Sequence, residues 1–226
     1  MHLVRLRTSA KGRIFGLQTQ WGVRVSLARL RRGDGLTLLE RAGVPEVWRR
    51  SVSECLALID FLDARIAPLE AELRPFAKAD TRAALLDTIP GVAELLALTI
   101  AAETGEISRF ASPEKLVSYG RLAPRVRQSG EGRPHTGPLN KSGSRLLGWA
   151  AVEAAQQAWR ESNPWHQLYT DVSRRSRNHN SAKAAVARTI LIAASHMLSR
   201  NQPFQPAPRC TSGTSVPASS RLALAA

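Results

Sequence analysis

The sequence is poor in cysteine, in aromatic residues and in long apolar runs. Its 226 residues include two cysteines, Cys55 and Cys210, too few for a disulfide framework or a zinc site with four cysteine ligands. Aromatic residues make up 5% of the chain, which argues against binding nucleic acid mainly by base stacking. No apolar run approaches the roughly 18 residues of a membrane span, and the start of the chain lacks a signal-peptide core. We therefore predict a soluble cytoplasmic protein with no membrane partner.

Acidic residues are also scarce compared with basic ones. The chain has 32 Lys+Arg against 18 Asp+Glu, which gives a formal net charge of +14 and a pI of about 11.3. An excess of this size favours a polyanionic partner, most simply nucleic acid. Hydrophobic residues make up 43% and charged residues 22%, which is typical of a globular chain. The sequence therefore predicts a folded, basic, nucleic-acid-binding protein.

Helical periodicity dominates the first part of the chain. Residues 3–21 have apolar side chains every three or four positions, as in an amphipathic helix, and residues 31–35 are typical of a turn. A heptad-like apolar seam follows, in which Pro68 is expected to kink or break the helix. The seam consists of Cys55, Leu58, Leu62, Ile66, Leu69, Leu73 and Phe76. It predicts either a coiled-coil-like arm that joins protomers or one helix of a compact bundle, and periodicity does not choose between them.

The remainder also has a helical pattern, and no strand pattern is convincing. Helix-start residues and apolar spacing predict further helices within residues 82–104, from Ser112-Pro113 to Tyr119, from Ser142 or Ser144 to Trp159, after Asn163-Pro164, and from Ser181 to Ser199. The predicted fold class is therefore mostly α. The expected domains are a helical arm over residues 1–80, a compact helical domain over residues 81–200, and a disordered tail over residues 201–226.

A turn inside residues 82–104 is a candidate DNA contact. The run Ile89-Pro90-Gly91-Val92 between two apolar helical segments is typical of a helix-hairpin-helix, in which backbone N–H groups bind a phosphate. Gly91 and Val92 are the candidate DNA-binding residues of this turn. An ordinary helix–helix turn explains the same pattern equally well.

A glycine-rich stretch from Leu122 to Lys141 has the form of a long loop, and loops of this length are usually functional or disordered. Its basic residues and those next to it are candidate phosphate contacts. The candidates are Arg125, Arg127, Arg133, Lys141 and Arg145. On composition alone, Ser129 is an ordinary loop serine. Further along, Arg174, Arg175, Arg177, Lys183 and Arg188 form a second basic cluster, either a backbone contact or a solvated helix end. The five histidines have no metal-ligand spacing.

The run from Leu86 to Ala154 resembles the C-terminal domain of the IS116/IS110/IS902 family of insertion-sequence transposases. The similarity is carried by several short segments in a specific order and spacing. These are Ile89–Val92, Ala102–Phe110, Ser112–Tyr119, Leu122–Arg125, Arg127–Gly130, Lys141–Leu147 and Val152–Ala155. Weaker similarity continues upstream and reaches Phe204 downstream.

The resemblance implies DNA transposition through a composite site. In this family an N-terminal RNase-H/RuvC-like domain holds metal-binding acids, and the C-terminal domain supplies a serine nucleophile, which here corresponds to Ser129. Some members are guided by a structured RNA. Helical arms assemble the protomers, so we expect a homo-oligomer joined by the seam.

The sequence departs from the family pattern at its start. No strand-borne acid set precedes the arm, and the acids of the seam, Asp60, Asp63, Glu70 and Glu72, are interpreted as solvated charges. We therefore predict a truncated element that has no cofactor in this chain, with the divalent metal bound by the missing domain. The predicted function is the DNA-binding C-terminal part of a transposase or recombinase, inactive alone. The alternative is a non-catalytic helix-hairpin-helix nucleic-acid-binding remnant.

Overall fold

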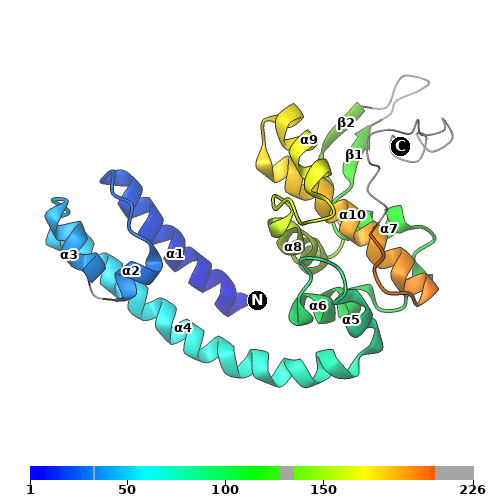
Figure 1. Cartoon of the computed structure of the whole chain (residues 1–226), viewed down its shortest axis with the longest axis horizontal. Helices are drawn as coiled ribbons and strands as arrows, with labels where there is room; N and C mark the ends of the chain where they lie inside the picture. The colour runs from blue at the N-terminus through cyan, green and yellow to red at the C-terminus, as the bar shows by residue number, and fades with distance from the viewer. Residues whose placement is uncertain (33, 128–134, 207–226) are drawn as a thin grey trace. The chain divides into compact units, whose positions relative to one another are not determined.

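The structure is a computed structural model that describes residues 1–32, 34–127 and 135–206 (Figure 1). The chain divides into an N-terminal unit, Met1–Phe76, and a C-terminal unit, Ala77–Ala226. The described residues are mostly helical, with ten α-helices, so the predicted fold class is confirmed at this level. The buried apolar side chains form two separate clusters, one in each unit.

The N-terminal unit is built from α1 (His2–Gln20), α2 (Leu27–Arg31), α3 (Asp34–Arg41) and α4 (Glu46–Ala79). The first of these confirms the amphipathic helix predicted over residues 3–21. Its apolar side packs against the following helices, because these elements together surround one buried cluster. The fully buried side chains of this cluster include Ile14, Leu30, Leu39, Val52 and Ile59.

Helix α4 contains the whole predicted seam. Of the kink or break expected at Pro68, the break is wrong, because the helix runs without interruption through Pro68 and Pro75. The kink stays a prediction. The first half of the seam is a helix of a compact bundle, since Leu62 and Ile66 are buried. The second half is different. Its side chains Leu69, Leu73 and Phe76 are 46–67% exposed. Leu58, in the first half of the seam, is also exposed, at 45%.

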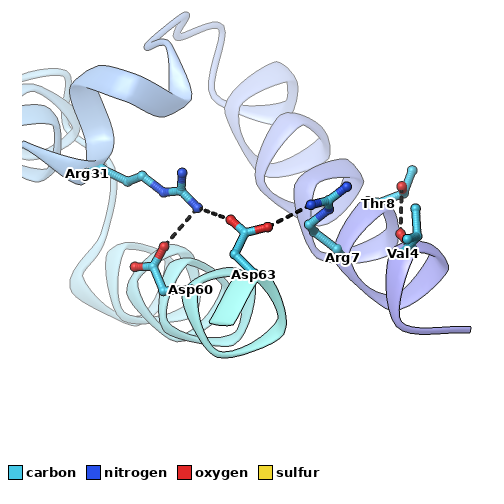
Figure 2. A network of polar contacts seen from close by, with 6 residues as sticks. All are labelled: Val4, Arg7, Thr8, Arg31, Asp60 and Asp63. Carbon is cyan, nitrogen blue, oxygen red and sulfur yellow. Dashed lines mark hydrogen bonds and ion pairs between the residues drawn. The ribbon is translucent and has the colours of Figure 1, made fainter. Parts of the chain in front are cut away.

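A polar network ties α1 and α2 to α4 (Figure 2). The carboxylate of Asp63 accepts hydrogen bonds from Arg7 at 2.7 Å and from Arg31 at 2.8 Å. Arg31 also pairs with Asp60 at 2.8 Å. The interpretation of Asp60 and Asp63 as merely solvated charges is therefore wrong, since both belong to an interhelical ion-pair network. Sequence spacing does not reveal it because the arginines come from other helices.

Asp63→Asn is expected to lower the free energy of unfolding of the N-terminal unit by about 1 kcal/mol at neutral pH. The pKa of Asp63 lies below its ordinary value because Arg7, and then Arg31, donate hydrogen bonds to the carboxylate. A carboxyl group of this kind stabilises fully above its unfolded pKa, near 3.9, and loses this contribution as the pH falls through the lower folded value. Urea titrations from neutral pH downward should therefore show wild type and variant converging in acid.

The control for this prediction is Asp60→Asn. Asp60 is 61% exposed at its side chain and pairs with Arg31 alone, so its loss is expected to cost less. The stabilising role of the Asp63 ion pairs would be contradicted if both variants lost the same free energy of unfolding. It would also be contradicted if the difference between Asp63→Asn and wild type did not shrink in acid.

The C-terminal unit contains α5 (Thr81–Leu86), α6 (Glu94–Thr104), α7 (Pro113–Tyr119), α8 (Arg145–Ala154), α9 (His166–Ser176) and α10 (His179–Arg200). Short 3-10 turns, η1 (Ile107–Arg109) and η2 (Ala155–Gln157), complete it. Helix α10 packs against α7, α8 and α9. Its buried face includes Val186, Ala187, Ile190, Leu191 and Ala194. This helix therefore forms the centre of the unit.

The local helix signals were mostly correct. Pro113 at the first position of α7 and the N-cap residues Ser112 and Ser144 are confirmed. The last helix starts earlier than predicted, because its N-cap is Asn178 and not Ser181. The Asn178 side chain accepts the backbone N–H of Asn180, the capping interaction that asparagine favours.

The stretch predicted as a loop is an antiparallel β-hairpin, so the expectation of no strand is wrong. Strand β1 (Pro124–Arg127) pairs with β2 (His135–Leu139), with an irregularity between Pro124 and Val126. The hairpin projects from the unit, and Val126 is 60% exposed. Strand β2 contains a glycine and a proline and has no alternating apolar pattern, which is the signal on which strand prediction depends.

The tail predicted as disordered begins with residues that pack on the C-terminal unit. Asn201 ends α10 in a left-handed conformation. The Phe204 N–H donates to Thr88 Oγ1 at 2.9 Å, and its ring lies 5.3 Å from that of Trp165. The prediction is therefore wrong for residues 201–206, and residues 207–226 lie outside the described part. No described helix is both long and apolar enough to cross a membrane.

Candidate nucleic-acid interface

Backbone hydrogen bonds join the two ends of the hairpin to each other and hold the chain on either side of it against α7. The donors Leu122, Asn140 and Ser144 bond the carbonyls of Val117, Ala123 and Tyr119 at 3.1, 2.8 and 2.7 Å. The strands therefore leave the helical core from a defined position. A basic arm held in this way loses less conformational freedom on binding than a free loop would.

Three glycines allow the backbones to approach at this root. An ideal Cβ on Gly148 would lie 2.2 Å from the carbonyl oxygen of Gly120, and one on Gly143 would lie 2.2 Å from that of Tyr119. Gly143 also has a φ of 102°, a conformation that favours glycine. Leu191 of α10 closes the root from the other side, because it lies against Gly120.

Arg121 adds a side-chain bond to the root. Its backbone is left-handed, with a φ of 60°, which costs a non-glycine residue roughly 1 kcal/mol. Its Nε donates to the carbonyl oxygen of Gly143 at 2.7 Å. The arginine therefore connects the start of the hairpin to its end, and this bond offsets part of the backbone strain.

Ser144 joins the root to α6. Its hydroxyl donates to Glu103 at 2.5 Å, and the same oxygen accepts the N–H of Leu147 at 3.0 Å. A hydroxyl beside a carboxylate is also the arrangement of an activated nucleophile. Here the oxygen already caps α8, so we assign Ser144 to holding the hairpin and not to chemistry.

The structure places three predicted DNA contacts on the surface near this root. Arg125 of β1, Lys141 after β2 and Arg145 at the start of α8 are all exposed. Arg127 lies in β1. Arg133 and the predicted nucleophile Ser129 lie outside the described residues, so their roles stay predictions. The exposed, basic character of the described part of the hairpin is suited to phosphate groups.

The candidate helix-hairpin-helix turn joins α5 to α6 as expected. Its Gly91 has a φ of 90°, and an added Cβ would lie 2.3 Å from the carbonyl oxygen of Ala154. Val92 is buried, and its N–H donates to Ile89 O at 2.9 Å. The glycine is thus needed for packing on α8, and the Val92 N–H already has a protein partner. Whether this turn contacts DNA stays a prediction.

Sequence reasoning missed Arg109 as a member of this region. Its guanidinium lies 4.7 Å from the ring centre of Phe110 and 4.8 Å from that of Tyr119, a cation–π arrangement on both rings. Its Nη2 donates to the carbonyl of Glu103 at 3.2 Å. The adjacent Arg-Phe pair was a possible signal, but the contact with Tyr119 depends on the packing of η1 against α7.

Among residues 1–32, 34–127 and 135–206, no three His, Cys, Asp or Glu side chains come together in a way that could hold a metal ion. The divalent metal implied by the family resemblance therefore has no fitting donor set in the described part of this chain. Its assignment to another domain stays a prediction.

The comparisons with known proteins identify the class. Residues 83–171, which include the hairpin and its root, match the model of the Transposase IS116/IS110/IS902 family. Residues 83–171 therefore carry a domain of this family of insertion-sequence transposases.

Three curated relatives support the match. A protein of insertion element IS116 from Streptomyces clavuligerus is 29% identical over 66% of this chain and 37% of its own length. A probable family 20 transposase from Pseudomonas aeruginosa is 26% identical over 68% of this chain and 46% of its own length. The transposase of insertion element IS1111A from Coxiella burnetii is 28% identical over 68% of this chain and 43% of its own length. The match therefore covers less than half of each relative.

Proposed function

We propose that the C-terminal unit is the DNA-contacting part of an insertion-sequence transposase and that the basic hairpin lies along a phosphate backbone. The observation that carries this proposal is the combination of exposed cations with a rigid root. Arg125 lies in a hairpin whose ends are bonded to each other and to α7, and Arg145 is the first residue of α8, which follows the hairpin. Cations in fixed positions bind phosphates with a smaller entropic cost than cations on a free loop.

The proposed contact is to the backbone and not to base edges. Arginine and lysine side chains on a projecting hairpin position the protein on DNA without reading sequence. The α5–α6 turn supports the same mode, because it ends at Ala93, the N-cap of α6, and the N-terminus of a helix favours a phosphate. We therefore expect weak sequence discrimination by this chain alone, with specificity coming from other parts or from a structured guide RNA.

For the chemistry, we propose that Ser129 is the nucleophile of the complete transposase, as the family resemblance implies. Its hydroxyl oxygen would bond to phosphorus while a bond from phosphorus to a deoxyribose oxygen breaks. The serine proton passes to a base, and the released sugar oxygen takes up a proton. Neighbouring cations such as Arg125 would offset charge on the attacked phosphate. A metal-binding domain would complete the site.

We further propose that the second half of α4 joins two protomers. Its apolar side chains Leu69, Leu73 and Phe76 follow one another at spacings of four and three residues and are about half exposed or more. A stripe with this spacing is the surface that a partner helix covers in a coiled coil. Leu62, by contrast, is buried within the chain and is unavailable for such a contact.

The proposed DNA contact predicts strongly salt-dependent binding. For the full chain and a duplex, the logarithm of the association constant should fall linearly with the logarithm of salt concentration. Arg125→Gln and Arg145→Gln should each reduce the slope by about one and weaken binding to all sequences alike. Fluorescence anisotropy across a salt series measures both effects.

Arg200→Gln is the matched control, because it removes an exposed cation at the far end of α10. It should leave the slope nearly unchanged. Binding that ignores salt, a strong preference for one duplex sequence, or equal effects of the control and hairpin variants would each refute the proposed contact.

A further inference from the structure

We propose that the corner between α9 and α10 is a second phosphate contact, made with the same DNA duplex that the hairpin binds. The corner is defined as residues 174–183. This inference rests on the proposed function of the hairpin but uses a different part of the surface. It is carried by the charge of the corner, by the backbone of Arg177 and by the fixed ring of His179.

The corner has a strong charge of one sign. Residues 172–188 contain five Lys/Arg and no Asp or Glu. Arg174, Arg175 and Arg177 are exposed. Arg174 pairs with Asp171 at 3.1 Å, but its side chain is 80% exposed. Such a pair is weak in water, so the arginine can exchange it for a phosphate.

Arg177 occupies a backbone position that normally favours glycine or asparagine. It ends α9 in the left-handed conformation, with a φ of 52°. Arg121 has a similar backbone but gains the bond to Gly143 described above. Arg177 is exposed, and a glycine in its place would remove the strain. Backbone strain often accompanies residues with a functional role, so it supports a role of the Arg177 side chain outside the fold.

The first residue of α10 supplies a fixed donor beside these arginines. Nδ1 of His179 lies 3.1 Å from the Tyr169 hydroxyl and 3.0 Å from Ser173 Oγ, and the His179 and Tyr169 rings are stacked. These contacts hold the ring at the N-terminus of a long helix, where backbone N–H groups favour a phosphate. In the tautomer whose Nδ1 accepts a hydroxyl, Nε2 carries an N–H that can donate to a phosphate oxygen.

The distance between the corner and the hairpin suits one duplex. Along α10, His179 at the corner is 12 residues from Leu191, which lies against Gly120 at the hairpin root. At 1.5 Å per residue this separation is about 18 Å, roughly half of a B-DNA turn. Figure 1 shows β1, β2 and the start of α10 toward the same end of the C-terminal unit. Between the two sites, the buried Nε of Arg188 has no hydrogen-bond partner within the described residues.

The test uses the full chain carrying Arg175→Gln and Arg177→Gly. Both positions are exposed and glycine fits the left-handed backbone, so the thermal midpoint should not fall. Binding to a 30-base-pair duplex near 0.1 M salt should weaken about tenfold, and the salt slope should fall by about two. A DNA hairpin with a four-base-pair stem, about 14 Å long and so too short to reach both sites, should show much less effect. Arg200→Gln is the control.

The outcomes separate the two proposals. If hairpin variants weaken binding and the corner variant does not, the corner contact is wrong and the proposed function stands. If only the corner variant weakens binding, the hairpin assignment is wrong. An equal effect on both duplex lengths refutes the shared duplex. If the corner variant binds an RNA duplex more weakly than wild type does but binds the DNA duplex equally well, DNA is not the partner of the corner.

Discussion

Gly148→Ala is expected to destabilise the C-terminal unit by about 2–3 kcal/mol and to displace the hairpin. Gly148 lies in α8, where alanine would normally stabilise the helix by up to about 1 kcal/mol. The added Cβ would, however, lie 2.2 Å from the carbonyl oxygen of Gly120. Both groups belong to backbone that hydrogen bonds hold in place, so neither yields easily, and overpacking of this kind usually costs 1–3 kcal/mol. Urea unfolding followed by circular dichroism measures the loss.

Gly16→Ala is the matched control for this prediction. Gly16 is also inside a helix, α1, but nothing lies within 4 Å of its added Cβ. The same substitution should therefore stabilise the N-terminal unit by roughly 0.5–1 kcal/mol. Opposite signs for the two variants would show that close backbone approach, and not glycine content, sets the effect. A stable Gly148→Ala variant with unchanged DNA affinity would contradict the proposed root.

The helix boundaries were predictable where a local signal fixed them. Ser144 marks the start of α8 because its side chain caps the helix, and the Ser112-Pro113 pair marks the start of α7. The hairpin was not predictable from the same kind of reasoning. Strand β2 contains a glycine and a proline, so the pattern is that of a loop. The ends of the hairpin are bonded to each other and to α7 by residues that are not adjacent in sequence.

The candidate site also contains some residues that could be predicted from the sequence and others that could not. Exposed cations such as Arg125 and Lys141 could be found from charge alone. The role of Gly91 could not, because the carbonyl that requires it belongs to Ala154, 63 residues away. The positions of Arg109 and Glu103 likewise depend on contacts between helices that are distant in sequence. The basic composition therefore predicts a surface suited to phosphate groups. Which residues hold the hairpin in place depends on packing between helices.

Ser129→Ala is expected to abolish formation of a covalent protein–DNA adduct. The test is a trapping assay on a junction substrate, with the full chain and an added RNase-H-like domain from a close relative. A serine hydroxyl reacts with phosphorus only when a base takes its proton and cations offset the charge on the phosphate. Arg125, Arg127 and Arg133 are the nearest cations in sequence, and Glu131 and His135 are the candidate bases.

The chain alone should bind DNA without forming the adduct, because we propose that the added domain completes the site. An adduct from the isolated chain would refute this dependence. An adduct that survives Ser129→Ala would show that another residue is the nucleophile. Ser144→Ala is the informative second variant, because its hydroxyl already bonds Glu103 and caps α8. We expect it to lower stability by about 1 kcal/mol, as loss of a cap does, and to leave adduct formation detectable. Complete loss of the adduct in a folded Ser144→Ala protein would transfer the catalytic role from Ser129 to Ser144.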